Sequence, residues 1–98
     1  MTGTHILILG GTAEARQLAT ELAVLGGVRV TTSLAGRVAR PRMPAGDVRI
    51  GGFGGAEGLA AWLRAQRVDA VVDATHPFAE VISSHAARAA ALTGTPLV

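Results

Sequence analysis

Two short apolar runs, each ended by a turn-forming segment, constrain the fold of this chain more than any other feature. Residues 6–9 run into Gly-Gly-Thr at 10–12, and residues 68–73 run into Ala-Thr-His-Pro-Phe-Ala at 74–79. A continuous apolar run is typical of a parallel strand that is covered on both faces. In an open parallel sheet both turns fall at carboxyl ends of strands, where ligands bind beside helix N-termini.

Strand-like and helix-like segments alternate along the chain. The expected strands are residues 5–9, 28–32, 47–50, 68–73 and 96–98, and the expected helices are residues 13–25, 57–67 and 78–92. Right-handed crossovers predict a Rossmann-like α/β domain of three layers, in which an open parallel sheet has strand order 3-2-1-4-5. In the first helix, Leu25 is expected to complete the inward stripe, and Pro77 is expected to open the third helix.

Composition and charge narrow the class of protein. The chain has 98 residues, 49% hydrophobic and 16% charged, as expected for one small globular domain. Its nine basic residues are all arginine and are spread along the chain, with three aromatic residues among Trp, Tyr and Phe, so nucleic-acid binding is disfavoured. Without a cysteine, a signal peptide or an apolar run of ~20 residues, the chain is expected to be soluble and cytoplasmic, without membrane contact.

The turn after the first strand resembles a dinucleotide-binding loop. Against the pattern G-x-G-x-x-G/A, Gly10 and Ala15 match, and Thr12 replaces the second glycine. Gly10 and Gly11 permit a tight turn, the Thr12 hydroxyl can cap the helix or bond a phosphate oxygen, and backbone donors from Ala13 onward complete an anion site. The alternative is a plain strand–turn–helix in which Thr12 is only the cap.

The end of the second expected strand carries no acidic residue. NAD-preferring domains commonly place Asp or Glu there to hold the ribose 2′-hydroxyl, but residues 31–37 read Thr-Thr-Ser-Leu-Ala-Gly-Arg. Ser33 and Arg37 suit a 2′-phosphate instead, because a guanidinium binds phosphate in a bidentate fork. A bound dinucleotide is therefore expected to be NADPH. Alternatively, Arg37, Arg40 and Arg42 form a solvated loop face or meet an acidic substrate.

The segment after the fourth expected strand lies across the point where the strand order reverses. Thr75 and His76 offer hydrogen-bond donors there, Pro77 fixes the turn, and Phe78 offers an apolar wall. His76 is a candidate proton donor or a group that orients a carboxylate. The alternative is structural, with His76 capping the helix and Asp73 bonding amides of the turn.

Three segments together resemble the precorrin-6A reductase family, which makes the corrin ring of cobalamin. They are residues 8–19, residues 33–37 and residues 73–79, of which the third is the most specific. The resemblance covers essentially the whole chain in the right order. It implies NADPH-dependent reduction of the tetrapyrrole precorrin-6A to precorrin-6B by direct hydride transfer, with no metal.

The resemblance also implies roles for individual residues and for a missing part. Residues 10–12 and 33–37 would hold the cofactor, and residues 75–78 would border the nicotinamide and the substrate. Family members are two-domain proteins of well over twice this length. The chain, residues 1–98, is therefore expected to be the N-terminal NADPH-binding domain, and a C-terminal domain is its expected partner.

Two alternatives stay open from the sequence. One is a nucleotide- or NADPH-binding module without catalysis of its own. The other is a different reductase or an epimerase, in which residues 73–78 serve another substrate.

Overall fold

The computed structural model describes residues 3–34, 43–77 and 79–98. Within those ranges, strands and helices alternate as the sequence predicts. In chain order they are β1 (Thr4–Leu9), α1 (Ala13–Ala23), β2 (Val28–Leu34), β3 (Asp47–Ile50), α2 (Gly55–Ala65), β4 (Ala70–Asp73) and α3 (Glu80–Thr93).

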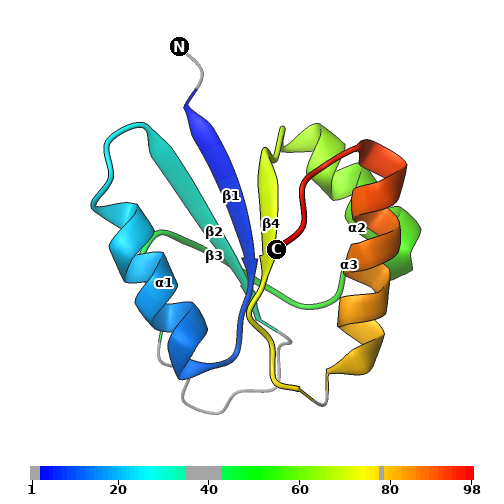
Figure 1. Cartoon of the computed structure of the whole chain (residues 1–98), viewed down its shortest axis with the longest axis horizontal. Coiled ribbons are helices and arrows are strands. Elements are labelled where there is room, and N and C mark those ends of the chain that lie inside the picture. The colour runs from blue at the N-terminus through cyan, green and yellow to red at the C-terminus, as the bar shows by residue number, and fades with distance from the viewer. Residues whose placement is uncertain (1–2, 35–42, 78) are drawn as a thin grey trace.

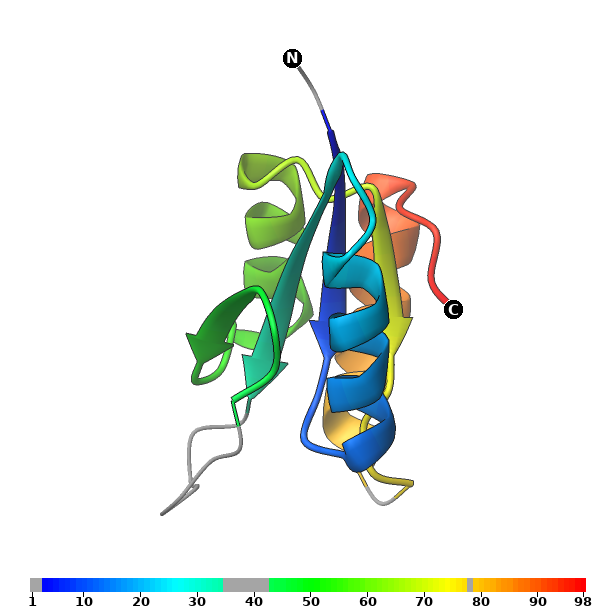
Figure 2. The same cartoon turned by 90° about the vertical axis from the view of Figure 1, so that its left-hand side faces the viewer.

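The four strands form one parallel sheet in the order β3-β2-β1-β4. β1 pairs with both β2 and β4, so the first apolar run occupies the centre of the sheet. The arrowheads of β1 and β4 point to one end of the molecule, where the segments that follow these two strands lie side by side (Figures 1 and 2). This end is the place that the sequence predicts for a ligand.

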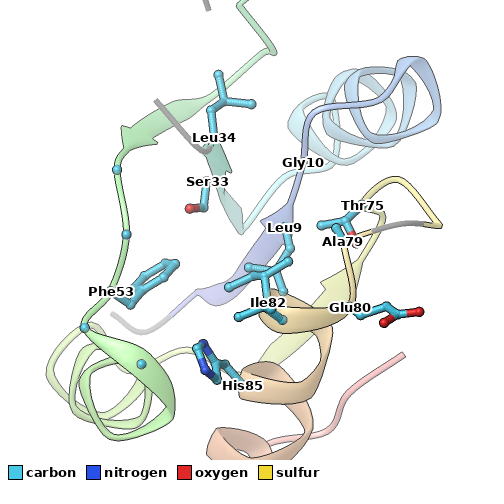
Figure 3. A pocket seen from close by; sticks show the side chains of 15 residues that line it. Leu9, Gly10, Ser33, Leu34, Phe53, Thr75, Ala79, Glu80, Ile82 and His85 are labelled. Carbon is cyan, nitrogen blue, oxygen red and sulfur yellow. The ribbon is translucent and has the colours of Figure 1, made fainter. Parts of the chain in front are cut away.

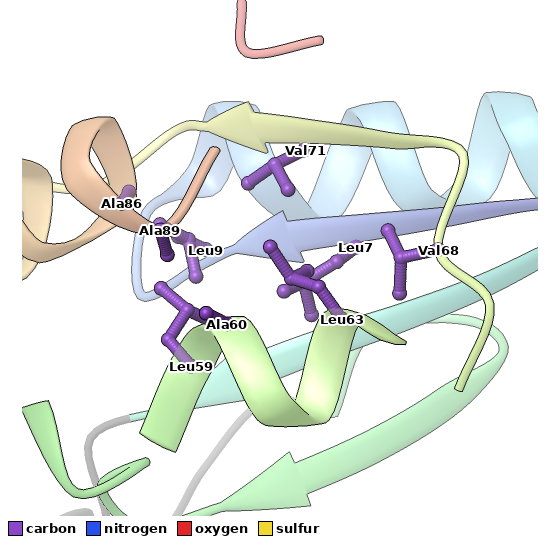
Figure 4. Packing of buried hydrophobic residues seen from close by; sticks show 9 residues of the cluster. All are labelled: Leu7, Leu9, Leu59, Ala60, Leu63, Val68, Val71, Ala86 and Ala89. Carbon is purple, nitrogen blue, oxygen red and sulfur yellow. The ribbon is translucent and has the colours of Figure 1, made fainter. Parts of the chain in front are cut away.

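The sheet separates two layers of helix, as expected for a three-layer domain. α1 covers one face, and α2 and α3 cover the other (Figure 1). Side chains alternate between the faces along β1, so Ile8 packs with Ala15 and Ala19 of α1. Leu7 and Leu9 point into the larger core under α2 and α3, which Figure 4 shows. The remaining members of that core are Leu59, Ala60, Leu63, Val68, Val71, Ala86 and Ala89.

The predicted strand order 3-2-1-4 is confirmed, but the fifth strand is absent. Residues 96–98 make a single parallel bridge, between Leu97 and Val71, on the outer side of β4. The carbonyl oxygen of Pro96 accepts from the N–H of Val71. The carbonyl oxygen of Val98 accepts from the N–H of Asp73, and the N–H of Val98 donates to the carbonyl oxygen of Val71. These bonds lie where a fifth strand would begin, but a single bridge is too little pairing to define residues 96–98 as a strand.

Two expected helix ends are wrong. α1 ends at Ala23 with Val24 as its C-cap, so Leu25 lies outside the helix and is 52% exposed instead of completing the inward stripe. α3 begins at Glu80, with Ala79 as its N-cap, so Pro77 lies outside the first turn. Pro77 disfavours a helical conformation for the residue before it, which is compatible with the later start.

Other elements also begin or end away from their expected bounds, and β4 begins at Ala70. β2 continues to Leu34 because Ser33 and Leu34 pair with Arg49 and Ile50 of β3. α2 begins at Gly55, two residues early, directly after Gly54 in the left-handed region. In the described part of the chain, no helix is both long and apolar enough to cross a membrane.

Candidate functional site

A cavity of about 470 Å³ lies at the carboxyl ends of the strands, between the beginnings of α2 and α3 (Figure 3). Its walls are the last residues of β1 and β2, residues 51–55, Thr75 and the first turns of α3. Most of the lining is apolar, and the polar side chains on it are Ser33, Thr75, Glu80 and His85. A mostly apolar cavity with a few polar groups is typical of a site for a small molecule or cofactor.

Gly10 is required where β1 ends, because the chain passes very close to β2. Its N–H donates to the carbonyl oxygen of Ser33 over 2.9 Å. A Cβ at position 10 would lie 2.6 Å from Cγ2 of Thr32, so another residue fits only if the Thr32 side chain or the backbone shifts. Gly11 follows with φ of 109°, and nothing lies within 4 Å of where its Cβ would be. The loop is therefore tight on the side of the sheet and open on the side of solvent.

Thr12 is the N-cap of α1, as one interpretation of the sequence expects. Its hydroxyl oxygen accepts from the N–H of Ala15 over 3.1 Å. The same hydroxyl donates to the carbonyl oxygen of Ala74 over 2.6 Å. The two segments that the sequence singles out are thus joined directly by a side chain of the first.

Asp73 and Thr75 order the segment that follows β4. One carboxylate oxygen of Asp73 accepts from the N–H of Thr75 over 3.1 Å and from its hydroxyl over 2.6 Å. Burial raises the pKa of Asp73, but hydrogen bonds from Ser83 and Thr75 lower it by more, so the pKa lies below its ordinary value. The expectation that Asp73 bonds amides of the turn is confirmed. The charged carboxylate holds Thr75 at the edge of the cavity.

The other predicted residues of this segment lie at the surface. His76 and Pro77 are exposed, and the carbonyl oxygen of His76 accepts from the N–H of Ala79. The N-cap of α3 is Ala79, so the alternative in which His76 caps the helix is wrong. Phe78 lies outside the described residues. The structure brings Thr75 to the cavity and does not put His76 or Pro77 on its wall.

Ser33 lies where the sequence places it, at the end of the second strand. It is buried and lines the cavity beside Gly10 (Figure 3). Arg37, Arg40 and Arg42 lie outside the described residues. Of the pair expected to contact a 2′-phosphate, Ser33 alone is therefore located.

The glycine-rich residues 51–55 form a larger part of the cavity wall than the sequence suggests. Phe53 packs edge-on against Trp62, with ring centroids 5.6 Å apart, and points toward the cavity in Figure 3. Arg49 lies over the Phe53 ring, with Cζ 3.7 Å from its centroid. The Arg49 guanidinium also donates to the carbonyl oxygens of Gly51 and Gly52 over 2.9 and 2.8 Å. Arg49 and Phe53 therefore fix the position of residues 51–55, in which the other four residues are glycine.

Sequence reasoning missed His85, Glu80 and Arg49. His85 lies one and a half turns into α3 and points toward the cavity opposite Phe53 (Figure 3). Its spacing from Ile82 would have indicated a shared helix face, but an isolated histidine gives no signal of a cavity. In the described ranges, no three His, Cys, Asp or Glu side chains gather as metal ligands would.

A family model described as "Precorrin-6x reductase CbiJ/CobK" matches residues 5–98. The chain belongs to this family. A precorrin-6A reductase of Rhodococcus erythropolis is 65% identical over 95 residues, which is 97% of this chain and 38% of the relative. A cobalt-precorrin-6A reductase of Salmonella typhimurium is 34% identical over 101 residues, 99% of this chain and 37% of the relative. The chain thus spans under two fifths of the length of these relatives.

Solved structures agree with the family and with the fold. A structure described as "CobK precorrin-6A reductase" superposes with a TM-score of 0.91 at 47% identity, over 96% of this chain and 37% of that chain. A Rossmann-fold NAD(P)-binding family protein from Shigella flexneri has a TM-score of 0.69 at 19% identity, over 96% of this chain and 49% of that chain. At that identity the second likeness shows the fold alone. The resemblance that the three sequence segments suggest is confirmed.

Proposed function

We propose that this chain is the cofactor-binding part of an enzyme that reduces precorrin-6A to precorrin-6B with NADPH. The observation that carries the proposal is family membership across residues 5–98, together with a cavity at the carboxyl ends of the strands. The chain spans about 38% of its relatives, so the proposal assigns the rest of the site to a C-terminal domain. It places the reaction in the cytoplasm, with which a chain lacking cysteine is compatible.

The residues around the first loop fit a dinucleotide. Gly10 and Gly11 bring backbone close to the edge of the sheet without side chains, and the space beside Gly11 is open. The N–H groups of Ala13 and Glu14 in the first turn of α1 have no intrahelical acceptor, so they can bond a phosphate. The hydroxyl of Thr12 already donates its proton to the carbonyl oxygen of Ala74, so Thr12 would bind the phosphate through its backbone N–H. Ser33 and Arg37 would bind the adenosine ribose and its 2′-phosphate.

When bound, NADPH would supply a hydride, and the residues of this chain would orient it and exclude water. Thr75 is held at the cavity edge by Asp73 and would bond the nicotinamide side of the cofactor. His76 and Pro77 are exposed beside it, where substrate bound by a second domain would meet them. His76 would there donate the proton that completes the reduction.

The test is NADPH oxidation by the full-length protein that contains this chain, with precorrin-6A as substrate. We expect oxidation that depends on precorrin-6A and yields its dihydro form. His76→Asn should lower kcat at least about tenfold with little change in KM, as expected for loss of a general acid. Arg88→Ala, an exposed change on α3, is the control and should leave both constants unchanged. No oxidation with precorrin-6A would contradict the proposal.

A second candidate is a binding module without catalysis of its own. The observation that favours it is the fraction of the relatives that this chain covers, 37–38%. Binding of NADPH without any oxidation in the full-length protein would support this candidate. Reduction of another tetrapyrrole in place of precorrin-6A would indicate a different reductase.

A further inference from the structure

Arg49 lies beside Ser33, the next-to-last residue of β2. In the ladder between β2 and β3, Ser33 and Arg49 are register partners, so their side chains leave the same face of the sheet. Ser33 lines the cavity, and Arg49 reaches Phe53 of the cavity wall. In Rossmann domains the end of the second strand is where the ribose 2′ position of the cofactor is held. Arg49 therefore stands next to that position, on a neighbouring strand.

Among the residues that the structure describes, no side chain of opposite charge pairs with Arg49. In the described ranges its hydrogen bonds go to the carbonyl oxygens of Gly51 and Gly52, and no carboxylate lies within ion-pair distance. Arg29, on the same sheet, shows the contrast, because Asp47 pairs with it over 2.9 Å. A guanidinium has five N–H donors, and two bonds leave the others able to bond a ligand.

Aromatic contacts hold the Arg49 guanidinium in place. Its Cζ lies 3.7 Å from the centroid of Phe53 and 5.9 Å from that of Trp62. Trp62 in turn packs against Phe53 and, at 6.1 Å, against the buried ring of His5. The side chain is therefore ordered before a ligand arrives, which lowers the conformational entropy lost on binding. An ordered guanidinium without a carboxylate is suited to a phosphate.

We propose that Arg49 binds the 2′-phosphate of NADPH and so sets the preference for NADPH over NADH. This inference rests on the proposed function, and it names a residue that the sequence pattern does not indicate. The phosphate would take the unused N–H donors of Arg49, while the bonds to Gly51 and Gly52 keep the guanidinium fixed. Ser33 would supply a hydroxyl to the same phosphate from the adjacent strand.

The test measures affinity for ligands that differ by the 2′-phosphate alone. Calorimetric titration of the full-length protein uses NADPH against NADH, and adenosine 2′,5′-bisphosphate against 5′-AMP. Arg49→Gln removes the charge but keeps an amide that can bond the loop carbonyls. We expect it to weaken binding of NADPH and of the bisphosphate about ten- to hundredfold, as for loss of a hydrogen bond to a charged group. Binding of NADH and 5′-AMP should change less than about twofold.

Two more variants separate charge from structure. Arg49→Lys keeps the charge without the fork and should retain part of the preference for NADPH. Arg29→Gln removes the arginine that Asp47 already neutralises and should leave all four affinities unchanged. Unchanged NADH binding in Arg49→Gln also shows that this variant is folded.

The outcomes distinguish this inference from the proposed function. Equal weakening of all four ligands by Arg49→Gln would mean that Arg49 only holds residues 51–53, and this would overturn the inference alone. Retention of the full NADPH preference by Arg49→Gln would overturn it as well. If the unaltered protein bound neither dinucleotide, or bound both equally, the NADPH assignment of the proposed function would fail, and the inference with it.

Discussion

The side-chain hydroxyl of Thr12 donates to the backbone carbonyl oxygen of Ala74 over 2.6 Å and so joins the loops that follow β1 and β4. The hydroxyl oxygen of Thr12 also accepts a hydrogen bond from the N–H of Ala15, and this bond caps α1. These loops are 62 positions apart in the chain and meet because β1 and β4 are neighbours in the sheet. One hydroxyl thus fixes both the start of a helix and the spacing of two segments of the candidate site.

Replacing Thr12 by Val should destabilise the protein by about 1–2 kcal/mol, because a cap and a bond between loops are lost together. Urea denaturation of the 98-residue chain, followed by the fluorescence of Trp62, its only tryptophan, measures this loss. Thr12→Ser should retain most of the stability, since it keeps the hydroxyl. Thr20→Val is the matched control, because the exposed Thr20 hydroxyl donates to the carbonyl oxygen of Arg16 in its own helix and so joins no loops. Equal losses at positions 12 and 20 would contradict the role given to Thr12.

Leu7 is buried in the core, whereas Leu25 is expected from the sequence to be buried and is not. Leu7 is fully buried under α2 and α3, and Leu25 is 52% exposed after the end of α1. Leu7→Ala should cost about 2–5 kcal/mol of unfolding free energy, because it removes buried methyl groups and leaves a cavity. Leu25→Ala should cost less than about 1 kcal/mol. The same urea denaturation measures both changes in unfolding free energy. A large loss of stability in Leu25→Ala would mean that Leu25 is buried with the inward face of α1, as the sequence predicts, and would contradict the structure.

The layers and the strand order could be predicted because apolar periodicity along the chain is a local property. Continuous apolar runs such as residues 6–9 indicate a buried parallel strand, and right-handed crossovers then limit the order. Element ends were predicted less well. Leu25 continues a helical spacing that the turn after Ala23 interrupts, and Pro77 precedes α3 without starting it.

The cavity could be predicted only in part, because it is formed by segments that are distant in the chain. Gly10 and Ser33 could be identified because each stands at the end of an expected strand, Gly10 in a glycine-rich turn and Ser33 where no acidic residue is present. Arg49 and His85 were missed because their importance comes from where folding puts their side chains. Arg49 lies over the ring of Phe53. His85 lines the cavity (Figure 3). Thr12 was identified as either a cap or a phosphate ligand. The bond to Ala74 that decides how its hydroxyl is used depends on the neighbouring strand.

Gly10→Ala should destabilise the protein by about 1–3 kcal/mol, as overpacking does in a closely packed interior. The new methyl group would meet Cγ2 of Thr32 at 2.6 Å, and the Thr32 side chain is buried, with 1% of its surface exposed. Gly26→Ala is the matched control, since nothing lies within 4 Å of a Cβ there. Thr32→Ser removes the opposing methyl group, so the double variant should recover part of the loss. Purely additive losses in that double-mutant cycle would show that the two residues do not compete for space.

Asp73→Asn should change how stability depends on pH. The pKa of Asp73 is lowered in the folded protein from its ordinary value of 3.8, since the hydrogen bonds from Ser83 and Thr75 outweigh burial. A lowered pKa means that the folded state favours the charged carboxylate, so its contribution is complete above the ordinary value and is lost as pH falls through the lower folded value. The stability difference between the unaltered chain and Asp73→Asn should therefore be constant above pH ~5 and shrink below pH ~4. Glu21→Gln, on the exposed side of α1, controls for the removal of a carboxylate at the surface. Urea denaturation at a series of pH values measures the difference, and one that grew as the pH fell would mean that the carboxylate is not stabilised by Thr75 and Ser83.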